Sequence, residues 1–389
     1  MTDAIDPNDF LGIDPLLSEE ERAVRDVVRQ LVHDRVLPDI GDWFERAEFP
    51  LEFAKLFGGL GLFGMHLHGY GCAGTNAVSY GLACMELEAG DSGFRSFVSV
   101  QGSLSMFAIY RWGSEEQKQE WLPRMAAGEA LGCFGLTEAD AGSDPGSMRT
   151  HAKRDGSDWI LSGSKMWITN GSIADVSIVW ANTDDDVRGF LVQKGTPGFT
   201  TNDVHRKLSL RASITSELIF DDVRLPDSAM LPEALSLGAA LSCLNEARYS
   251  IVWGSMGAAR SCFETALEYS KTRVQFGKPI GAFQLTQKKL SDMAIELGKG
   301  TLLALHLGRM KDEGRLRHEQ VSFGKLNNTR EALEIAREAR SMLGASGITL
   351  EYPIIRHMNN LESVYTYEGT AEVHTLAIGS VLTGLRAFS

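Results

Sequence analysis

Hydrophobic positions recur at helical spacing through the first part of the chain. Ser18 with Glu21, and Ser114 with Gln117, fit the S-x-x-E/Q pattern that begins a helix, in which the two residues cap each other's backbone N–H groups. After the first pair, apolar residues follow at i, i+3, i+4, i+7 and i+8, namely at Val24, Val27, Val28, Leu31 and Val32. Residues 1–130 are therefore predicted to form an N-terminal helical domain.

The middle of the chain changes to short apolar runs separated by turn-forming pairs. The runs are VSIVW (176–180), GFLV (189–192) and ELIF (217–220). The turn-forming pairs are Asp155-Gly156, Ser162-Gly163, Asn170-Gly171 and Pro197-Gly198. Because Asp-Gly and Asn-Gly between β-rich runs are typical of hairpins, residues 131–233 are predicted to form an antiparallel β domain, either a barrel or a sandwich. Asp184 to Asp186 are expected to lie in an exposed turn.

Helical spacing returns in the last part of the chain. Leu290, Met293, Ala294 and Leu297 again follow at i, i+3, i+4 and i+7. Three or four long segments, at about 235–270, 284–311, 317–343 and 367–386, predict an antiparallel bundle within residues 234–389. The expected fold class is thus α+β and multi-domain: an N-terminal helical domain, a middle β domain and a C-terminal four-helix bundle.

Composition and charge narrow the function classes. The chain has 389 residues, of which 43% are hydrophobic, and a net charge of −13. This acidic balance argues against a nucleic-acid partner, for which a basic patch is expected. The beginning MTDAIDPNDF lacks the features of a secretory signal, and no run of about 18 apolar residues predicts membrane insertion. The scattered cysteines predict free thiols and a cytoplasmic location: Cys72, Cys84, Cys133, Cys243 and Cys262.

Two suggestive patterns do not support a site. GLGLFG (59–64) is formally G-x-G-x-x-G, but it follows residues at helical spacing and precedes a loop, whereas a dinucleotide motif follows a strand and opens a helix. We interpret it as a helix end. His66 and His68 lack a third ligand, and Glu372 and His374 do not have the E-x-x-H spacing of di-iron bundles. No metal site is predicted.

Four stretches are unusual for a helical scaffold. CFGLTEADAGSDPGSM (133–148) offers backbone and hydroxyl donors to a planar heterocycle or an oxyanion. In KMWITNG (165–171), Trp167 taken alone is better interpreted as a core residue. TRVQFGKPIGAFQ (272–284) taken alone is a connector with a surface arginine. ESVYTYEGTAEVH (362–374) contains Glu368, which is either a buried acid paired with a lysine or arginine, or a working base.

Together these stretches resemble the acyl-CoA dehydrogenase family of flavoenzymes, over about residues 15–387. The glutaryl-CoA dehydrogenase branch is most similar, on DSGFRSFVSVQGSL (91–104), LNEARYSIVWG (244–254) and VYTYEGTAEVH (364–374). The resemblance implies the same three domains, with FAD bound between the β domain and the bundle. It also implies a homotetramer built from two dimers and electron-transferring flavoprotein as the acceptor.

The resemblance assigns cofactor contacts residue by residue. Five residues would line the flavin and the thioester chain: Phe134, Leu136, Thr137, Gly142 and Ser143. Trp167, Ile168 and Thr169 would cover the isoalloxazine ring. Arg273 and Gln284 would reach the FAD of a neighbouring subunit. The remaining contacts would come from Leu343, Gly344, Gly347, Thr370 and Glu372.

Glu368 matches the family's catalytic base. Removing the weakly acidic α-proton of a thioester needs a carboxylate whose pKa is raised by desolvation, and the neighbouring aromatic residues Tyr365 and Tyr367 would exclude water from it. In the family, the backbone N–H of this residue helps to stabilise the enolate oxygen. Gly369 would let the backbone approach the ligand closely.

Arg95 bears on the substrate class. Taken alone it is a salt-bridged loop arginine, whereas in the glutaryl branch the matching arginine binds the distal carboxylate of the substrate. Glu88 matches an acid that orients this arginine. Other matches to substrate-binding positions are Ser96, Ser143, Thr169, Asn245, Arg248, Tyr367 and Gly369. For Arg248, a helix salt bridge is the alternative.

The function implied is FAD-dependent α,β-dehydrogenation of a dicarboxylyl-CoA, with glutaryl-CoA oxidised and decarboxylated to crotonyl-CoA and carbon dioxide. The sequence leaves chain length open, because one methylene changes pocket discrimination by only about 1–3 kcal/mol. Three alternatives remain: a dehydrogenase of a longer diacid such as adipyl-CoA, an acyl-CoA oxidase, and a non-catalytic flavin-binding helical protein.

Overall fold

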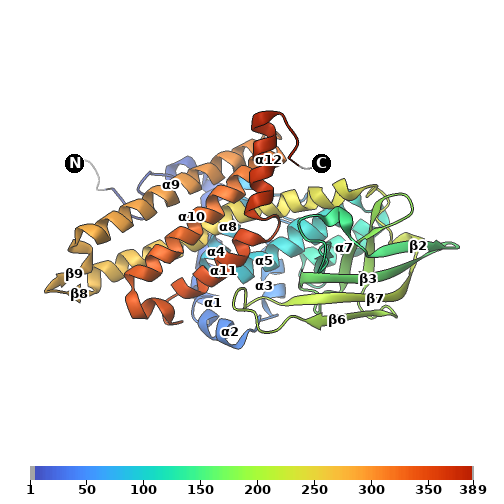
Figure 1. Cartoon of the computed structure of the whole chain (residues 1–389), viewed down its shortest axis with the longest axis horizontal. Helices are drawn as coiled ribbons and strands as arrows, with labels where there is room; N and C mark the ends of the chain where they lie inside the picture. The colour runs from blue at the N-terminus through green and yellow to red at the C-terminus, as the bar shows by residue number, and fades with distance from the viewer. Residues whose placement is uncertain (1–4, 388–389) are drawn as a thin grey trace.

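The computed structural model describes residues 5–387 and places helices at one end of an elongated molecule and a β domain at the other (Figure 1). The helices before the sheet are α1 (Glu19–Arg35), α2 (Ile40–Arg46), α3 (Phe53–Gly59), α4 (Ala77–Gly90), α5 (Ser92–Ser99), α6 (Phe107–Trp112) and α7 (Glu115–Ala126). A π-helical turn, Val100–Met106, joins α5 to α6. The predicted N-terminal helical domain is thus observed.

Local chemistry accounts for the helix starts. Both predicted capping boxes form, at Ser18 with Glu21 and at Ser114 with Gln117. The apolar stripe of α1 is narrower than predicted, because Val27 is exposed while Val28 and Val32 are buried. Helix α4 is buried nearly all round, so it is the central helix against which α1 and the C-terminal helices pack.

The β domain is a mixed sheet. Its strands are β1 (Gly132–Gly135), β2 (His151–Asp155), β3 (Asp158–Thr169), β4 (Val176–Asn182), β5 (Val187–Gln193), β6 (Phe199–Asp203) and β7 (Thr215–Pro226). The order is β1-β4-β2-β3-β7-β6, with β5 paired to β4. The prediction of a purely antiparallel domain was wrong, because β4 pairs in parallel with both β1 and β2. Apolar runs reveal strands but not their direction.

The turn-forming pairs had different outcomes. Asp155-Gly156 forms the predicted hairpin between β2 and β3, with Gly156 at φ +65°. Ser162-Gly163 lies instead inside β3, at a β-bulge where the register with β7 shifts. Asn170-Gly171 is a turn but not a hairpin, because β3 and β4 do not pair. Asp184 to Asp186 are exposed between β4 and β5, as predicted.

Strand β4 lies between two hydrophobic cores. Val176, Ile178 and Trp180 belong to the core shared with the helices. Val179 and Ala181 belong to the core that the sheet encloses. Alternate side chains of a strand point to opposite faces, so one short strand joins both cores.

The C-terminal part contains one more helix than predicted. Its members are α8 (Leu237–Thr272), α9 (Gln284–Asp312), α10 (His318–Met342), α11 (Ile354–Thr366) and α12 (Ala371–Thr383), with a small hairpin, β8 (Val274–Gln275) and β9 (Lys278–Pro279), between α8 and α9. The predicted last helix at about 367–386 is observed as α12, but it begins at Ala371 because the chain breaks at residues 367–370, and α11 before the break was not predicted. Residue 367 is the end of α11 rather than the start of a helix.

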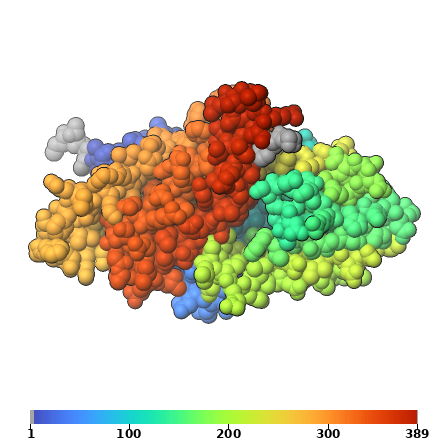
Figure 2. Space-filling view, in the orientation of Figure 1, coloured from blue at the N-terminus to red at the C-terminus, as the bar shows by residue number. Residues whose placement is uncertain are grey.

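Figure 2 shows α12 standing out from the surface where the bundle meets the β domain. The predicted domain boundaries at 130/131 and 233/234 fall between α7 and β1 and between β7 and α8. The division into domains over 1–130, 131–233 and 234–389 stays a prediction. None of the helices within residues 5–387 combines the length and apolar composition needed to cross a bilayer.

Candidate active site

Glu368 lies in the short break between α11 and α12, in an unusual backbone conformation. Its φ is +52°, in the left-handed region that non-glycine residues rarely adopt. Gly369 follows at φ +100°, and a Cβ there would lie 2.8 Å from Nε2 of His374. Thr370 then caps α12, accepting a hydrogen bond from the backbone N–H of Val373. Two consecutive positive φ angles therefore turn the chain sharply between α11 and α12.

The Glu368 carboxyl group is enclosed but incompletely hydrogen-bonded. Its Oε2 is buried without a hydrogen-bond partner among the described residues. Burial raises the pKa of Glu368, and the nearby cations Arg95, Arg248 and Lys325 oppose that rise. A carboxylate with a free oxygen and a raised pKa is a stronger base than one in water, which suits proton abstraction.

A buried ion pair lies beside Glu368. The Nε of Arg95 donates to Oε2 of Glu88 at 2.7 Å, and the two side chains are only 1% and 0% exposed. Burial alone would lower the pKa of Arg95, but Glu88 raises it well above the ordinary value, so the guanidinium stays charged. Arg95 also donates to the Tyr367 hydroxyl, and the Ser96 hydroxyl lies 3.5 Å from the same oxygen. The predicted cluster of Glu88, Arg95, Ser96 and Tyr367 is thus assembled.

The α8 backbone makes room for this pair at a glycine. A Cβ on Gly254 would lie 2.0 Å from Oε2 of Glu88, so no larger residue fits without displacing the carboxylate. Ser92 donates to the other carboxylate oxygen of Glu88 at 2.8 Å. Glu88 is therefore held on both oxygens, and this fixes the guanidinium that it orients.

Arg248 connects α8 to the same loop. Its Nε donates to the backbone oxygen of Glu368 at 2.7 Å, and its Nη1 donates to Oδ1 of Asn245 at 3.1 Å. These partners are a carbonyl and an amide, so the alternative of a helix salt bridge does not describe Arg248. The contacts place both Arg248 and Asn245 near Glu368.

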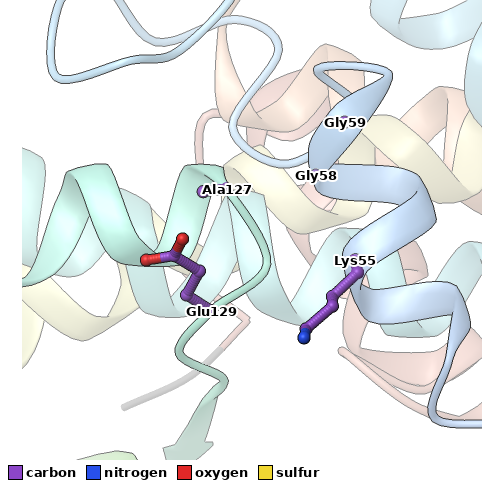
Figure 3. A pocket seen from close by; sticks show the side chains of 5 residues that line it. All are labelled: Lys55, Gly58, Gly59, Ala127 and Glu129. Carbon is purple, nitrogen blue, oxygen red and sulfur yellow. The ribbon is translucent and has the colours of Figure 1, made fainter.

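A surface cleft at α3 and α7 is separate from this cluster. It measures about 580 Å³ and is lined by Lys55, Gly58, Gly59, Ala127 and Glu129 (Figure 3). A Cβ on Gly58 would lie 2.2 Å from the backbone oxygen of Ala127, so the glycine serves close packing. Gly59 is the last residue of α3, which agrees with interpreting GLGLFG as a helix end.

Models of three successive family domains match the sequence. They are the N-terminal, middle and C-terminal domains of acyl-CoA dehydrogenase, over residues 18–129, 133–223 and 237–383. The chain belongs to the acyl-CoA dehydrogenase family. It is therefore an FAD-dependent acyl-CoA dehydrogenase.

Individual relatives align over almost their whole length. A glutaryl-CoA dehydrogenase from Mycobacterium smegmatis, solved in complex with FADH2, is 66% identical with a TM-score of 0.98, covering 99% of this chain and 100% of that chain. A glutaryl-CoA dehydrogenase solved with glutaryl-CoA is 33% identical with a TM-score of 0.91, covering 95% and 96%. By sequence, an acyl-CoA dehydrogenase of Bacillus subtilis is 35% identical, covering 95% and 99%. The human mitochondrial short-chain specific acyl-CoA dehydrogenase is 33% identical, covering 95% and 92%.

The β domain of this dehydrogenase presents groups that fit FAD. Trp167 is 58% exposed at φ +65°, where the register of β3 with β7 shifts, so the interpretation of Trp167 as core was wrong. Ile168 points into the β core, which leaves its backbone for a ligand. An open indole beside the partly exposed Thr169 suits a planar ring with polar edges.

Strand β1 and the loop after it contain the other predicted β-domain contacts. Phe134 and Leu136 are buried, while Thr137 is half-buried and Gly142 and Ser143 are exposed. Lys165, which the sequence analysis did not single out, fixes this loop by donating to the Leu136 carbonyl at 3.0 Å and to Glu138 at 2.8 Å. The hydroxyl and backbone groups of the loop are thus presented on a rigid support.

Other predicted cofactor residues lie away from this face. Arg273 and Gln284 are exposed around the β8–β9 hairpin, at the end of the molecule opposite the β domain (Figure 1). Leu343 is buried, and Gly344 and Gly347 lie in the turn after α10. One chain does not bring Arg273 and Trp167 together, so a contact of Arg273 with a neighbouring subunit's FAD stays a prediction. Glu372 is exposed in the first turn of α12.

Sequence analysis missed two buried polar residues beside Glu368. Lys325 on α10 donates to three backbone carbonyls around Glu368. His374 on α12 is buried against Gly369, and both ring nitrogens lack a partner among the described residues. Lys325 was detectable in principle, because it follows Val321 by one helical turn and precedes Asn328 on the buried face of α10.

Proposed function

We propose that this dehydrogenase oxidises a dicarboxylyl-CoA, with glutaryl-CoA converted to crotonyl-CoA and carbon dioxide. The observation that carries the proposal is Arg95, a fully charged guanidinium buried beside the catalytic loop. Burying a charge next to an alkyl tail is costly, whereas a carboxylate on the substrate would pair with it. The 66% identity to the M. smegmatis glutaryl-CoA dehydrogenase supports the same substrate class.

The residues that we propose to bind the distal carboxylate lie close to the residue that we propose to abstract the α-proton. Tyr367, whose hydroxyl bonds to Arg95, precedes Glu368 directly in the chain. A substrate with its carbonyl near Glu368 would therefore extend its far end toward Arg95, Tyr367 and Ser96. This arrangement favours a short diacid over a monocarboxylic acyl chain.

Glu368 would take the α-proton of the thioester onto its unpartnered oxygen. FAD would be held by the predicted residues Phe134, Leu136, Thr137, Gly142, Ser143, Trp167, Ile168 and Thr169. When bound, it would accept two electrons as a hydride from the β carbon of the substrate. The backbone N–H of Glu368 would donate to the enolate oxygen. Arg248 binds the carbonyl of the following peptide, between Glu368 and Gly369. In a glutaryl group the carboxylate then lies on the carbon next to the new double bond, so the carbon–carboxylate bond can break with its electrons delocalised toward the thioester.

A second cavity adjoins the proposed site through Asn245. It measures about 330 Å³ and is lined by residues of α6, α8, the end of α9 and the start of α10, among them Asn245, Lys311, Arg317 and His318. We assign it to the CoA portion of the substrate, because cationic side chains at its edge suit phosphates. Asn245 also binds Arg248, which connects this cavity to the base.

Exposed apolar residues support the proposed homotetramer. Phe276 is 95% exposed at the tip of the β8–β9 hairpin, and Val274 and Leu285 are exposed beside it. Such a patch next to Arg273 and Gln284 suits burial against a neighbouring subunit, which would bring both residues to that subunit's FAD. Electron-transferring flavoprotein is the acceptor that we propose.

Anaerobic titration of the flavin spectrum tests the proposal. Glutaryl-CoA is expected to bleach the flavin and release carbon dioxide, butyryl-CoA to bleach it far more slowly, and E368Q to retain FAD but lose fast reduction. E362Q, which neutralises an exposed carboxylate on α11, is the matched control. Equal bleaching by butyryl-CoA would reject the role of Arg95, and fast reduction in E368Q would reject the base.

The same titration separates the alternatives. Bleaching by adipyl-CoA without carbon dioxide would indicate a longer diacid, because one more methylene interrupts the conjugation that decarboxylation needs. Rapid reoxidation of the reduced protein by oxygen with peroxide release would indicate an oxidase. A flavin that no thioester reduces would indicate a non-catalytic protein.

A further inference from the structure

Lys325 is a buried lysine that the proposed reaction does not use directly. Its side chain is 0% exposed on α10, and its Nζ donates to the backbone oxygens of Tyr365 at 3.2 Å, Tyr367 at 2.7 Å and Gly369 at 2.7 Å. These three acceptors come from alternate residues of the turn that contains Glu368. The turn therefore wraps around a single ammonium group.

The number of bonds matches the charged form of lysine. An ammonium has three N–H donors and no acceptor, whereas a neutral amine has only two donors and would turn a lone pair toward a carbonyl. Hydrogen bonds from a charged donor are stronger than those of neutral pairs. They offset the cost of the left-handed conformation of Glu368.

Charges from several elements surround this turn. Arg95 of α5, paired with Glu88 of α4, faces it from one side and Arg248 of α8 from another, while His374 of α12 packs against Gly369. Burial lowers the pKa of Lys325 to about 7, with Glu368 opposing this effect, so the ammonium form that the three bonds require predominates below that pH. Burial also lowers the pKa of His374 to about 3, which keeps that imidazole neutral.

We propose that Lys325 is a positioning residue for the base: by gathering the carbonyls of residues 365, 367 and 369, it holds Glu368 in its left-handed conformation with the carboxylate turned into the site. The inference rests on Glu368 being the base. Lys325 bonds only to backbone oxygens in this turn, so it acts through the turn rather than on the substrate.

The test compares the FAD-loaded K325M and K325Q proteins with wild type and with K289M. Methionine keeps the unbranched shape without a donor, and glutamine keeps two N–H donors. Lys289 is a partly exposed lysine of α9 that pairs with Glu338, so K289M controls for the loss of a charge from the bundle. The readouts are FAD content, hydrogen exchange of the peptide spanning residues 364–374, and flavin reduction against pH.

K325M is expected to retain FAD, to exchange amide hydrogens about 10-fold faster in that peptide alone, and to reduce flavin about 100-fold more slowly, since a misplaced group can cost that much. Losing a nearby cation should also move the acidic limb of the pH profile to higher pH. K325Q is expected to recover part of both effects. K289M should match wild type in each measurement.

Two outcomes distinguish this inference from the proposed function. Fast flavin reduction in E368Q would show that the base itself is misassigned. An inactive E368Q with wild-type local exchange and pH profile in K325M would overturn the role of Lys325 alone. If K325M does not fold, K325Q decides, because a uniform loss of stability without faster exchange at 364–374 would mean that the lysine serves only the packing of α10.

Discussion

Replacing Glu88 with glutamine is a sharp test of the buried ion pair. The substitution keeps the shape of the side chain and its contact with Ser92, but it removes the carboxylate bonded to Arg95 at 2.7 Å. Removing one partner of a fully buried pair costs about 3–5 kcal/mol, because the other charge stays buried without compensation. E88Q should therefore be markedly less stable than wild type.

The size of this loss can be expressed as a melting temperature. Unfolding entropy averages about 2.1 cal/mol/K per residue, so for a chain of 389 residues each kcal/mol shifts Tm by roughly 1.2 °C. The predicted decrease is then about 4–6 °C. If the site binds a diacid, the carboxylate of the ligand should replace the missing Glu88 and restore much of this loss.

Flavin fluorescence during heating measures this directly in the FAD-loaded protein. Thioether analogues of glutaryl-CoA and butyryl-CoA lack the carbonyl, so they bind without being oxidised. The diacid analogue should raise the Tm of E88Q more than it raises that of wild type, and the monoacid analogue should not. Equal gains from both analogues, or an unchanged Tm in E88Q, would refute the assignment of Arg95 to the substrate carboxylate.

Three further predictions follow from the other side chains. Because the pKa of Glu368 is raised on folding, its ionisation lowers the free energy of unfolding as pH rises through the folded pKa. E368Q should therefore have a higher Tm than wild type at neutral pH. A Tm difference between the two proteins that persists below about pH 4 would contradict this. Because burial lowers the pKa of His374 to about 3, the free energy of unfolding should fall as pH drops below about 6.5. In chemical denaturation, H374Q should reduce the slope of unfolding free energy against pH by up to about 1.4 kcal/mol per pH unit. An unchanged slope would argue against this prediction. Trp167 is largely exposed, so W167A should change Tm little in the FAD-free protein yet release FAD more readily on dilution; a large loss of apoprotein stability would mean that the indole is packed.

Sequence patterns predicted the fold where the structure-forming contacts are local. The capping box of Ser18 with Glu21 involves one helical turn, and the Asp155-Gly156 hairpin involves two adjacent strands. The parallel pairing of β4 with β1 joins segments more than 40 residues apart, and nothing in either run encodes it. The same limit explains the missed break at residues 367–370, which is stabilised by Lys325 from another helix.

The site was predicted from resemblance more than from physical chemistry. Taken alone, Trp167 was assigned to the core, because burial is the usual fate of tryptophan and its positive φ cannot be read from the sequence. Arg95 and Glu88 lie seven residues apart in the sequence, on α5 and α4. Their contact therefore depends on the bend at Asp91 between the two helices. Arg248 and Lys325 donate hydrogen bonds to backbone carbonyls. Every residue has such a carbonyl, so the sequence does not show which ones serve as partners.

Both faces of β4 are buried, and this affects how the protein unfolds. Since alternate residues of this strand complete two cores, neither the helices nor the sheet can lose its structure without exposing apolar surface of the other. The parallel partner β1, which leads into the loop that we propose to contact the flavin, is anchored by the same strand. Thermal or chemical denaturation should therefore be one cooperative transition of the helices and the sheet, with no stable intermediate in which the sheet has separated from the helices.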